Sequence, residues 1–135
     1  MSGSFGNFLE NELLDHVFQC GGANYVPVAN LYVSLSTAAP LDTGAGIAEP
    51  AAGAYERATA NASHFAVAAN GIVTNDANIA FPTATLAWGT ITHFGIHDAN
   101  VAGNMLAHGS LATPKVISAG DTAKFVVGDL AISLD

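Results

Sequence analysis

Turn-forming residues interrupt the chain at short intervals from residue 30 onward, and this punctuation restricts the folds open to it. Between the turns, apolar and polar residues alternate, most clearly in residues 31–36. Alternation with a period of two is typical of a strand that buries one face, here the face of Leu31, Val33 and Leu35. No strand–helix–strand pattern follows, which excludes the parallel nucleotide-binding folds.

Similar stretches continue to the C-terminus and predict about eight short strands. Asn70-Gly71 is a strong hairpin signal, and residues 98–104 form a second predicted turn between two pairing strands. One strand is expected to end at Pro82. The stretches that supply the strands are 31–36, 55–60, 64–68, 72–74, 77–81, 90–97, 105–111, 124–127 and 130–134. Together they predict an all-β fold, an antiparallel β-sandwich or jelly roll.

The first 20 residues have a helical period instead. Apolar side chains recur there at spacings of one, three and four, which predicts one amphipathic helix over residues 6–19. Ser4 is its expected N-cap, and Gly21-Gly22 is its expected end. The helix is expected to pack on its own domain, with a neighbouring protein as the alternative. The apolar residues are Phe5, Phe8, Leu9, Leu13, Val17 and Phe18.

The predicted organisation is a helical segment at residues 1–22 and a β-sandwich domain at residues 23–135, forming a single globular unit. Residues 37–54 contain two prolines and three glycines and show no periodicity, so they predict a long surface loop. Loops of this length in a compact domain are often functional or contact a partner.

Charged residues are scarce: 3 Lys and Arg with 11 Asp and Glu make up 10% of the chain, against about 25% in ordinary soluble domains. The basic residues are Arg57, Lys115 and Lys124, and the net charge is −8. Three cations are too few for a run of phosphates or an anionic membrane surface, which argues against nucleic-acid and membrane binding. A surface so poor in charge predicts that copies of the same chain cover part of it, the alternative being a neutral surface of small residues.

No stretch reaches the roughly 20 consecutive apolar residues of a membrane span. No secretory signal is visible, because Glu10, Glu12 and Asp15 interrupt the segment where its apolar core would lie. Cys20 is the only cysteine, so no disulfide forms within the chain. These features predict a protein made in the cytoplasm.

The histidines are the first candidates for metal or acid–base chemistry: His16, His64, His93, His97 and His108. His93 and His97 share a strand face but lie about 13 Å apart along it, too far to bind one zinc ion. His108 would approach one of them only in a register that the sequence does not determine. The histidines are therefore expected to be ordinary polar side chains, and neither a metal nor a cofactor is predicted.

The remaining reactive side chains give no catalytic pattern. Five aspartates fall in predicted turns, where the side chain caps backbone N–H groups. Glu49 and Glu56 lack a recognisable catalytic context, and Cys20 lies at a helix C-terminus, which disfavours a thiolate. No catalytic residue is predicted, and the chain is expected not to be an enzyme. The aspartates are Asp42, Asp76, Asp98, Asp121 and Asp129.

Several segments resemble a family of small virion proteins of tailed bacteriophages, often labelled tail fibre proteins and similar to head decoration or cement proteins. The resemblance covers nearly the whole chain. It implies a non-enzymatic structural subunit of the virion that is made in the host cytoplasm and forms a homotrimer. The segments are 11–18, 25–27, 31–37, 49–50, 55–57, 81–84, 88–89, 90–98, 103–109 and 120–122.

Two placements in the virion follow from the resemblance. The short chain without a fibrous repeat favours head decoration, in which trimers bind the major capsid protein and stabilise the shell. The alternative is a tail fibre or tail-tip protein that binds other tail proteins or a host-surface glycan, with Tyr32, Tyr55 and Trp88 as its aromatic candidates. A cellular carbohydrate-binding module is a third class.

Overall fold

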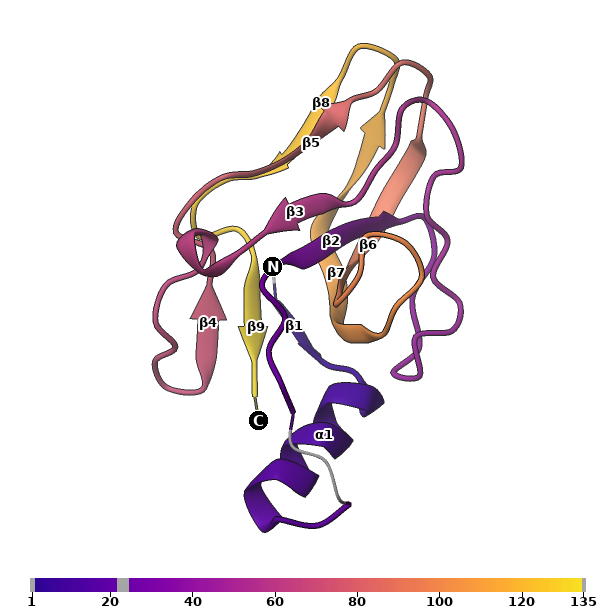
Figure 1. Ribbon diagram of the computed structural model, residues 1–135. Helices are drawn as coiled ribbons and strands as arrows, with labels where there is room; N and C mark the ends of the chain where they lie inside the picture. Colours follow the sequence, from indigo (N-terminus) through magenta and orange to yellow (C-terminus); the bar gives the residue numbers. More distant parts are fainter. Residues whose placement is uncertain (1, 22–24, 135) are drawn as a thin grey trace.

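The computed structural model describes residues 2–21 and 25–134. Their strands form a 7-stranded sheet in the order β3-β2-β6-β7-β1-β9-β4 and a 2-stranded sheet of β5 and β8 (Figure 1). The predicted all-β, sandwich-like fold with one N-terminal helix is confirmed. In chain order the elements are β1 (Ser2–Phe5), α1 (Asn7–Phe18), β2 (Leu31–Ser36), β3 (Ala58–Ala60), the 3₁₀ helix η1 (Ala62–His64), β4 (Ile72–Thr74), β5 (Ile79–Thr83), β6 (Gly89–His97), β7 (Met105–Ile117), β8 (Thr122–Phe125) and β9 (Ala131–Ser133).

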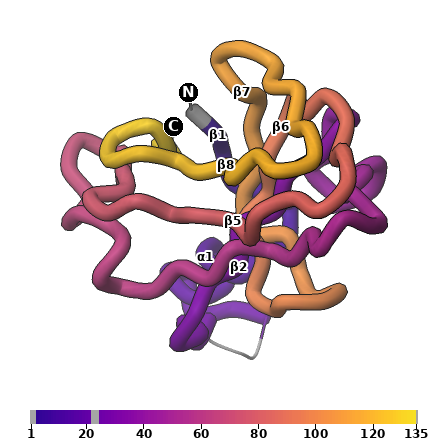
Figure 2. The backbone as a smooth tube through the Cα atoms, turned by 90° about the horizontal axis from the view of Figure 1, so that it is seen from above, coloured from indigo at the N-terminus to yellow at the C-terminus, as the bar shows by residue number. Residues whose placement is uncertain are grey.

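The two layers of the sandwich are joined by a long two-stranded ribbon that folds over on itself. The predicted hairpin across residues 98–104 is confirmed as β6 and β7, and its two strands continue beyond a bend as β5 and β8. Backbone hydrogen bonds cross the bend, from Trp88 N–H to the Ile117 carbonyl (2.9 Å) and from Ala84 N–H to the Asp121 carbonyl (2.8 Å). The ribbon therefore doubles back and places β5 and β8 over one end of the larger sheet (Figures 1 and 2).

The core lies between these two layers and is rich in aromatic rings. The Phe125 ring of β8 lies 5.9 Å from the Phe94 ring of β6 and 6.2 Å from the Phe81 ring of β5, both edge-on. Edge-on contacts of this kind are a preferred arrangement for buried aromatic rings. Val33 and Leu35 of β2 pack into the same core, as the alternating pattern predicts.

The opposite face of β2 is also buried, which the sequence analysis did not predict. Ser34 and Ser36 have no exposed surface, because the loop at residues 37–54 folds back over them. The Ser36 hydroxyl accepts a hydrogen bond from the Ala48 N–H at 2.9 Å. A side chain at Gly95 would come within 3.2 Å of Ile47, so this glycine permits close approach of the loop. The predicted loop is confirmed, and it covers a sheet face.

The N-terminus begins with a strand that the sequence analysis missed. β1 lies between β7 and β9, antiparallel to the first and parallel to the second, so one pair departs from the predicted antiparallel arrangement. The Ser-Gly-Ser-Phe sequence carries little apolar signal. Its position depends on close packing, since a Cβ at Gly3 would lie 2.5 Å from the His108 carbonyl oxygen.

Helix α1 matches the predicted range but not its predicted caps. Ser4 belongs to β1, and the N-cap is Gly6, which supplies no capping side chain. The helix ends at Phe18 because Gln19 adopts a left-handed conformation with φ 56°, ahead of the predicted stop at Gly21-Gly22. Gly22 lies outside the described residues. No helix within the described ranges is long and apolar enough to cross a membrane.

The hairpin at Asn70-Gly71 is confirmed. Both residues have positive φ, 54° and 74°, as a type I′ turn requires. The strand predicted at 64–68 is wrong: residues 62–64 form η1, capped by Asn61, and only the isolated pairs Phe65–Asn75 and Ala69–Ile72 follow. Val67, in the middle of this segment, is 94% exposed.

Strands β5 and β7 are both longer than predicted, and each contains a proline. The first was expected to end at Pro82, and the second was expected to end before Pro114. β5 continues through Pro82, which has no N–H group to donate. The register with β8 shifts between Ala80 and Thr83, so the strands pair on both sides of the proline. β7 extends beyond the predicted end at residue 111, to Ile117. Its register with β6 also shifts. Residues 111–114, which include Pro114, lie opposite a single β6 residue and form a bulge.

Candidate binding groove

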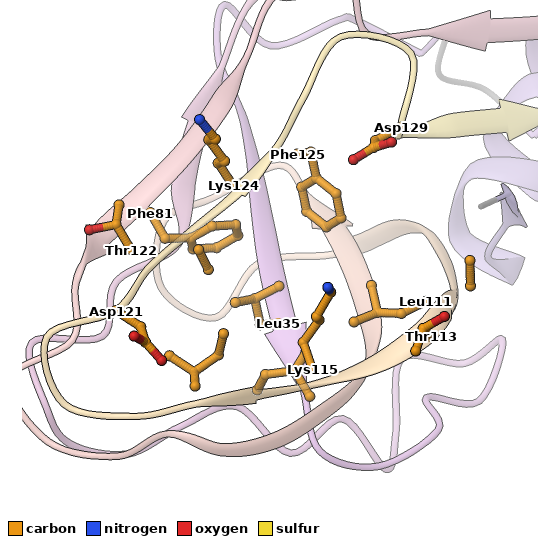
Figure 3. A pocket seen from close by; sticks show the side chains of 14 residues that line it. Leu35, Phe81, Leu111, Thr113, Lys115, Asp121, Thr122, Lys124, Phe125 and Asp129 are labelled. Atoms are coloured by element: carbon orange, nitrogen blue, oxygen red, sulfur yellow. The ribbon is translucent and has the colours of Figure 1, made fainter.

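A groove of about 510 Å³ opens on one side of the folded ribbon, between the C-terminal half of β7 and strand β8 (Figure 3). Volumes of this size are typical of small-ligand and side-chain pockets. Its lining comes from both layers of the sandwich and from the bend between them. The lining residues are Leu35, Phe81, Ile91, Leu111, Ala112, Thr113, Lys115, Ile117, Asp121, Thr122, Ala123, Lys124, Phe125 and Asp129.

The groove exists because β7 and β8 follow each other in sequence but do not pair. β1 covers the outer edge of β7 only as far as Gly109, and β8 pairs only with β5. Within the described residues, the outer edges of β7 beyond Gly109 and of β8 therefore carry no ladder. The bulge at residues 111–114 widens the mouth further.

The floor of the groove is apolar and continuous with the core. Leu35, Phe81 and Phe125 lie behind the opening in Figure 3, and each is almost fully buried. Their small exposed remainder faces the groove, so an occupant would contact apolar surface at the centre of the site. Apolar surface that an occupant covers contributes about 25 cal/mol per Å².

The rim carries charges of both signs. Lys115 and Lys124, two of the chain's three basic residues, lie there with Asp121 and Asp129. The Asp121 carboxylate accepts a hydrogen bond from the Ser118 N–H at 2.8 Å and so caps the turn. Lys115 reaches into the opening in Figure 3, and within the described part of the chain neither lysine forms an ion pair. The sequence analysis named both lysines but gave no signal that they converge, because the bend that brings β8 over β7 is a tertiary feature.

A second polar cluster lies on the other side of the sheet, and its main pair was missed in the sequence. Glu49 and Arg57 form a two-pronged ion pair, with the Arg57 Nη2 2.7 Å from the Glu49 Oε2. The same guanidinium donates to the carbonyls of Ala99 (2.8 Å) and Ala102 (2.9 Å). Arg57 therefore joins the loop at residues 37–54 to the β6–β7 turn, and its donors are engaged within the fold.

The neighbouring groups in this cluster have shifted pKa values. Burial raises the pKa of Glu49, but hydrogen bonds from Arg57 and Tyr55 outweigh this and hold it below its usual value. Burial, followed by the charge of Arg57, lowers the pKa of His97 to about 4. His97 is therefore neutral at pH 7 and hydrogen-bonds the Ser34 hydroxyl at 2.9 Å. Burial also raises the pKa of Tyr55, whose hydroxyl donates to Glu49 at 2.7 Å.

The five histidines lie on four elements, with only His93 and His97 on the same one, strand β6. His16 lies exposed on α1, His64 bonds Asn61 at the start of η1, and His93 bonds Thr92. His108 lies opposite Gly95 in the register and bonds Asp42 instead of another histidine, at 2.7 Å. In residues 2–21 and 25–134, no three His, Cys, Asp or Glu side chains lie close enough together to hold a metal ion.

The predicted turn-capping role is confirmed for two of the aspartates. Asp98 accepts a hydrogen bond from the Asn104 N–H at 2.7 Å, and Asp121 caps its turn as described above. Asp42 instead bonds His108 through its side chain. The side chains of Asp76 and Asp129 are exposed. Of the five aspartates, Asp121 and Asp129 line the groove, and the other three do not.

The remaining sequence candidates also have structural roles. Cys20 is exposed and donates to Asp15 at 3.3 Å, and that hydrogen bond raises the pKa of the thiol. The Trp88 indole is buried and donates to the Gly53 carbonyl at 2.9 Å, and Tyr55 packs against it edge-on. Tyr32 is half-buried and Glu56 is exposed. These aromatic rings do not form an exposed platform for a sugar.

Comparison with known protein families identifies the family of this chain. No curated protein matches the sequence. Residues 4–133 match the family described as podophage GP4 fiber I protein gp80. The match spans nearly every residue, from β1 to the end of β9, and confirms the resemblance to a phage virion family labelled tail fibre. The chain belongs to this family of podophage fibre proteins.

Proposed function

We propose that the chain is a non-enzymatic structural subunit of a podophage fibre, made in the host cytoplasm and incorporated into the virion. The observation that carries this proposal is the match of residues 4–133 to a family named for a podophage fibre protein. The sequence analysis favoured head decoration, for which the family name gives no support, so the fibre function takes first place.

The structure supports a role in assembly through the kind of surface it presents. Apolar side chains stay exposed on α1 and at Val116 of β7, while the polar groups of the Glu49–Arg57 cluster bond one another. Exposed apolar surface of this sort marks contact sites between proteins. We propose that the chain forms a homotrimer, as its resemblance to the phage virion family implies, and that other tail proteins are its further partners. We further propose a host-surface glycan as the ligand of the fibre.

Immunogold electron microscopy of purified virions tests this proposal, with antibodies raised against the recombinant chain. Gold at the tail, together with a copy number well below that of the major capsid protein, is the expected result. Uniform labelling of the head with a copy number near that of the capsid protein would support decoration instead and overturn the fibre assignment. Absence of the chain from purified virions would overturn both.

A further inference from the structure

Helix α1 presents an apolar face that nothing within the described residues covers. Leu14, Val17 and Phe18 are 55%, 68% and 72% exposed, although their spacing of three and four residues places them on one side of the helix. Only Leu9, in the first half of the helix, is buried against the domain. An exposed phenylalanine in such a stripe is typical of a helix that docks into a groove of another protein.

The groove between β7 and β8 has the complementary character. It is open, has an apolar floor of Leu35, Phe81 and Phe125, and lies at the far end of the molecule from α1 (Figure 1). Because the two sites lie at opposite ends, the helix of one copy does not reach its own groove. A contact between them joins two copies through different surfaces, head to tail.

Charge favours this pairing over other contacts between copies. Each copy carries a net charge of −8, so two copies repel each other over most of their surfaces. At the groove rim, Lys115 and Lys124 balance the charges of Asp121 and Asp129, so a second copy meets less repulsion there than over the acidic remainder of the surface. Glu10 lies one helical turn before Leu14, on the same exposed face, and brings a carboxylate toward the rim when the stripe enters the groove.

We propose that the Leu14–Val17–Phe18 face of α1 inserts into the β7–β8 groove of a second copy, with Glu10 paired to Lys115. This deepens the proposed function and rests on it for its biological role, since a fibre requires repeated contacts between subunits. Head-to-tail contacts of this kind close into a ring when the rotation between neighbours divides a full turn, which accommodates a trimer.

Sedimentation equilibrium over a concentration series tests the apolar half of the contact. The wild-type chain is expected to associate. Phe18→Ser should raise the dissociation constant roughly 30-fold, as for a central interface residue. Val67→Ser is the matched control, since Val67 is 94% exposed but lies outside both surfaces, and it should leave association unchanged. A wild-type chain that stays monomeric at high concentration would overturn the proposal.

Charge reversal tests which surfaces meet. Glu10→Lys and Lys115→Glu should each weaken association about tenfold, and the double variant should recover most of the loss. Circular dichroism melting checks that each variant is folded. Association that is insensitive to Lys115→Glu, or a double variant no better than the singles, would show that copies meet elsewhere.

Virion incorporation separates this inference from the proposed function. A Phe18→Ser chain that is still found at the tail, although the purified variant is monomeric, would overturn the α1–groove contact as the basis of assembly and leave the fibre function intact. Loss of the variant from the virion, with wild type retained, supports both.

Discussion

Strands β6 and β7 run through both ends of the sandwich, but their surroundings differ from one end to the other. At the end near residues 93–97, β2 and β1 continue the sheet on both sides, and the loop at residues 37–54 covers its polar face. At the end near Gly89 and Ile117, no strand of the described residues continues the sheet beyond β7, and the groove opens beside the core. We call these the closed end and the open end.

The difference shows how one small domain divides stability and assembly between its parts. The closed end satisfies its buried polar groups internally, and no buried side-chain polar atom within the described residues lacks a partner. A buried polar network stabilises the fold when all of its hydrogen bonds are formed, and it destabilises the fold strongly when a partner is removed. The open end leaves apolar surface and strand edges to a neighbour, so substitutions there should affect association more than folding.

The largest effect is expected for Val33→Asp, which places a carboxylate in the core of the closed end. Val33 has no exposed surface and packs in the apolar core cluster, so the charge would be buried among apolar side chains. We expect a loss of more than about 4 kcal/mol in the free energy of unfolding, enough to abolish folding. Circular dichroism and thermal melting measure this. A normal melting curve would contradict the buried position of this residue.

Acid should weaken the closed end next, through His97. Its pKa is about 4 in the folded chain against 6.5 for an exposed histidine, so the unfolded chain binds a proton that the folded chain does not. Stability is therefore complete above pH 6.5 and falls between pH 6.5 and 4, by about 3 kcal/mol. Urea unfolding across this range measures the slope. The His97→Gln variant should flatten it, and an unchanged slope would locate the titration in another group.

Removal of the Arg57 side chain should have a somewhat smaller effect. Arg57→Ala leaves Glu49 and the carbonyls of Ala99 and Ala102 without their donor, and we expect a loss of about 2–3 kcal/mol. Arg57→Lys keeps the charge but not the planar fork and should recover only part of the loss. Urea unfolding at pH 7 measures both variants. Full recovery by lysine would show that charge alone matters at this site.

The smallest effect is expected at the open end. Val116→Asp introduces the same side chain as Val33→Asp into the same sheet, but Val116 is 66% exposed. Its free energy of unfolding should change by only about 0.5 kcal/mol, as for an ordinary surface position. Thermal melting beside Val33→Asp gives the contrast directly. A loss comparable to that of Val33→Asp would remove the distinction between the two ends.

The closed end could be predicted in part, and the open end hardly at all. Local patterns identified strands where apolar residues alternate, the turn at Asn70-Gly71 and the length of α1. They missed β1, because residues 2–5 are held by packing between β7 and β9 and carry little apolar signal of their own. They also missed the burial of Ser34, since a single strand does not show what covers its polar face.

The groove depends on contacts that no local pattern records. Lys115, Lys124 and the phenylalanines of its floor come together only because the ribbon bends at residues 84–88 and 118–121. The Glu49–Arg57 pair likewise depends on how the loop at residues 37–54 returns to the sheet. Composition showed only that basic residues are scarce, and the bend is what brings two of the three to the groove rim.

The prolines within β5 and β7 have a consequence for the protein before it meets any partner. A free sheet edge with an unbroken row of N–H and C=O groups is a template for uncontrolled stacking into fibrillar aggregates. Pro82 and Pro114 each remove a donor, and the bulge at residues 111–114 bends the edge of β7 out of register. Newly synthesised copies are thereby kept from polymerising through their backbones, and side-chain recognition decides when and with what they combine.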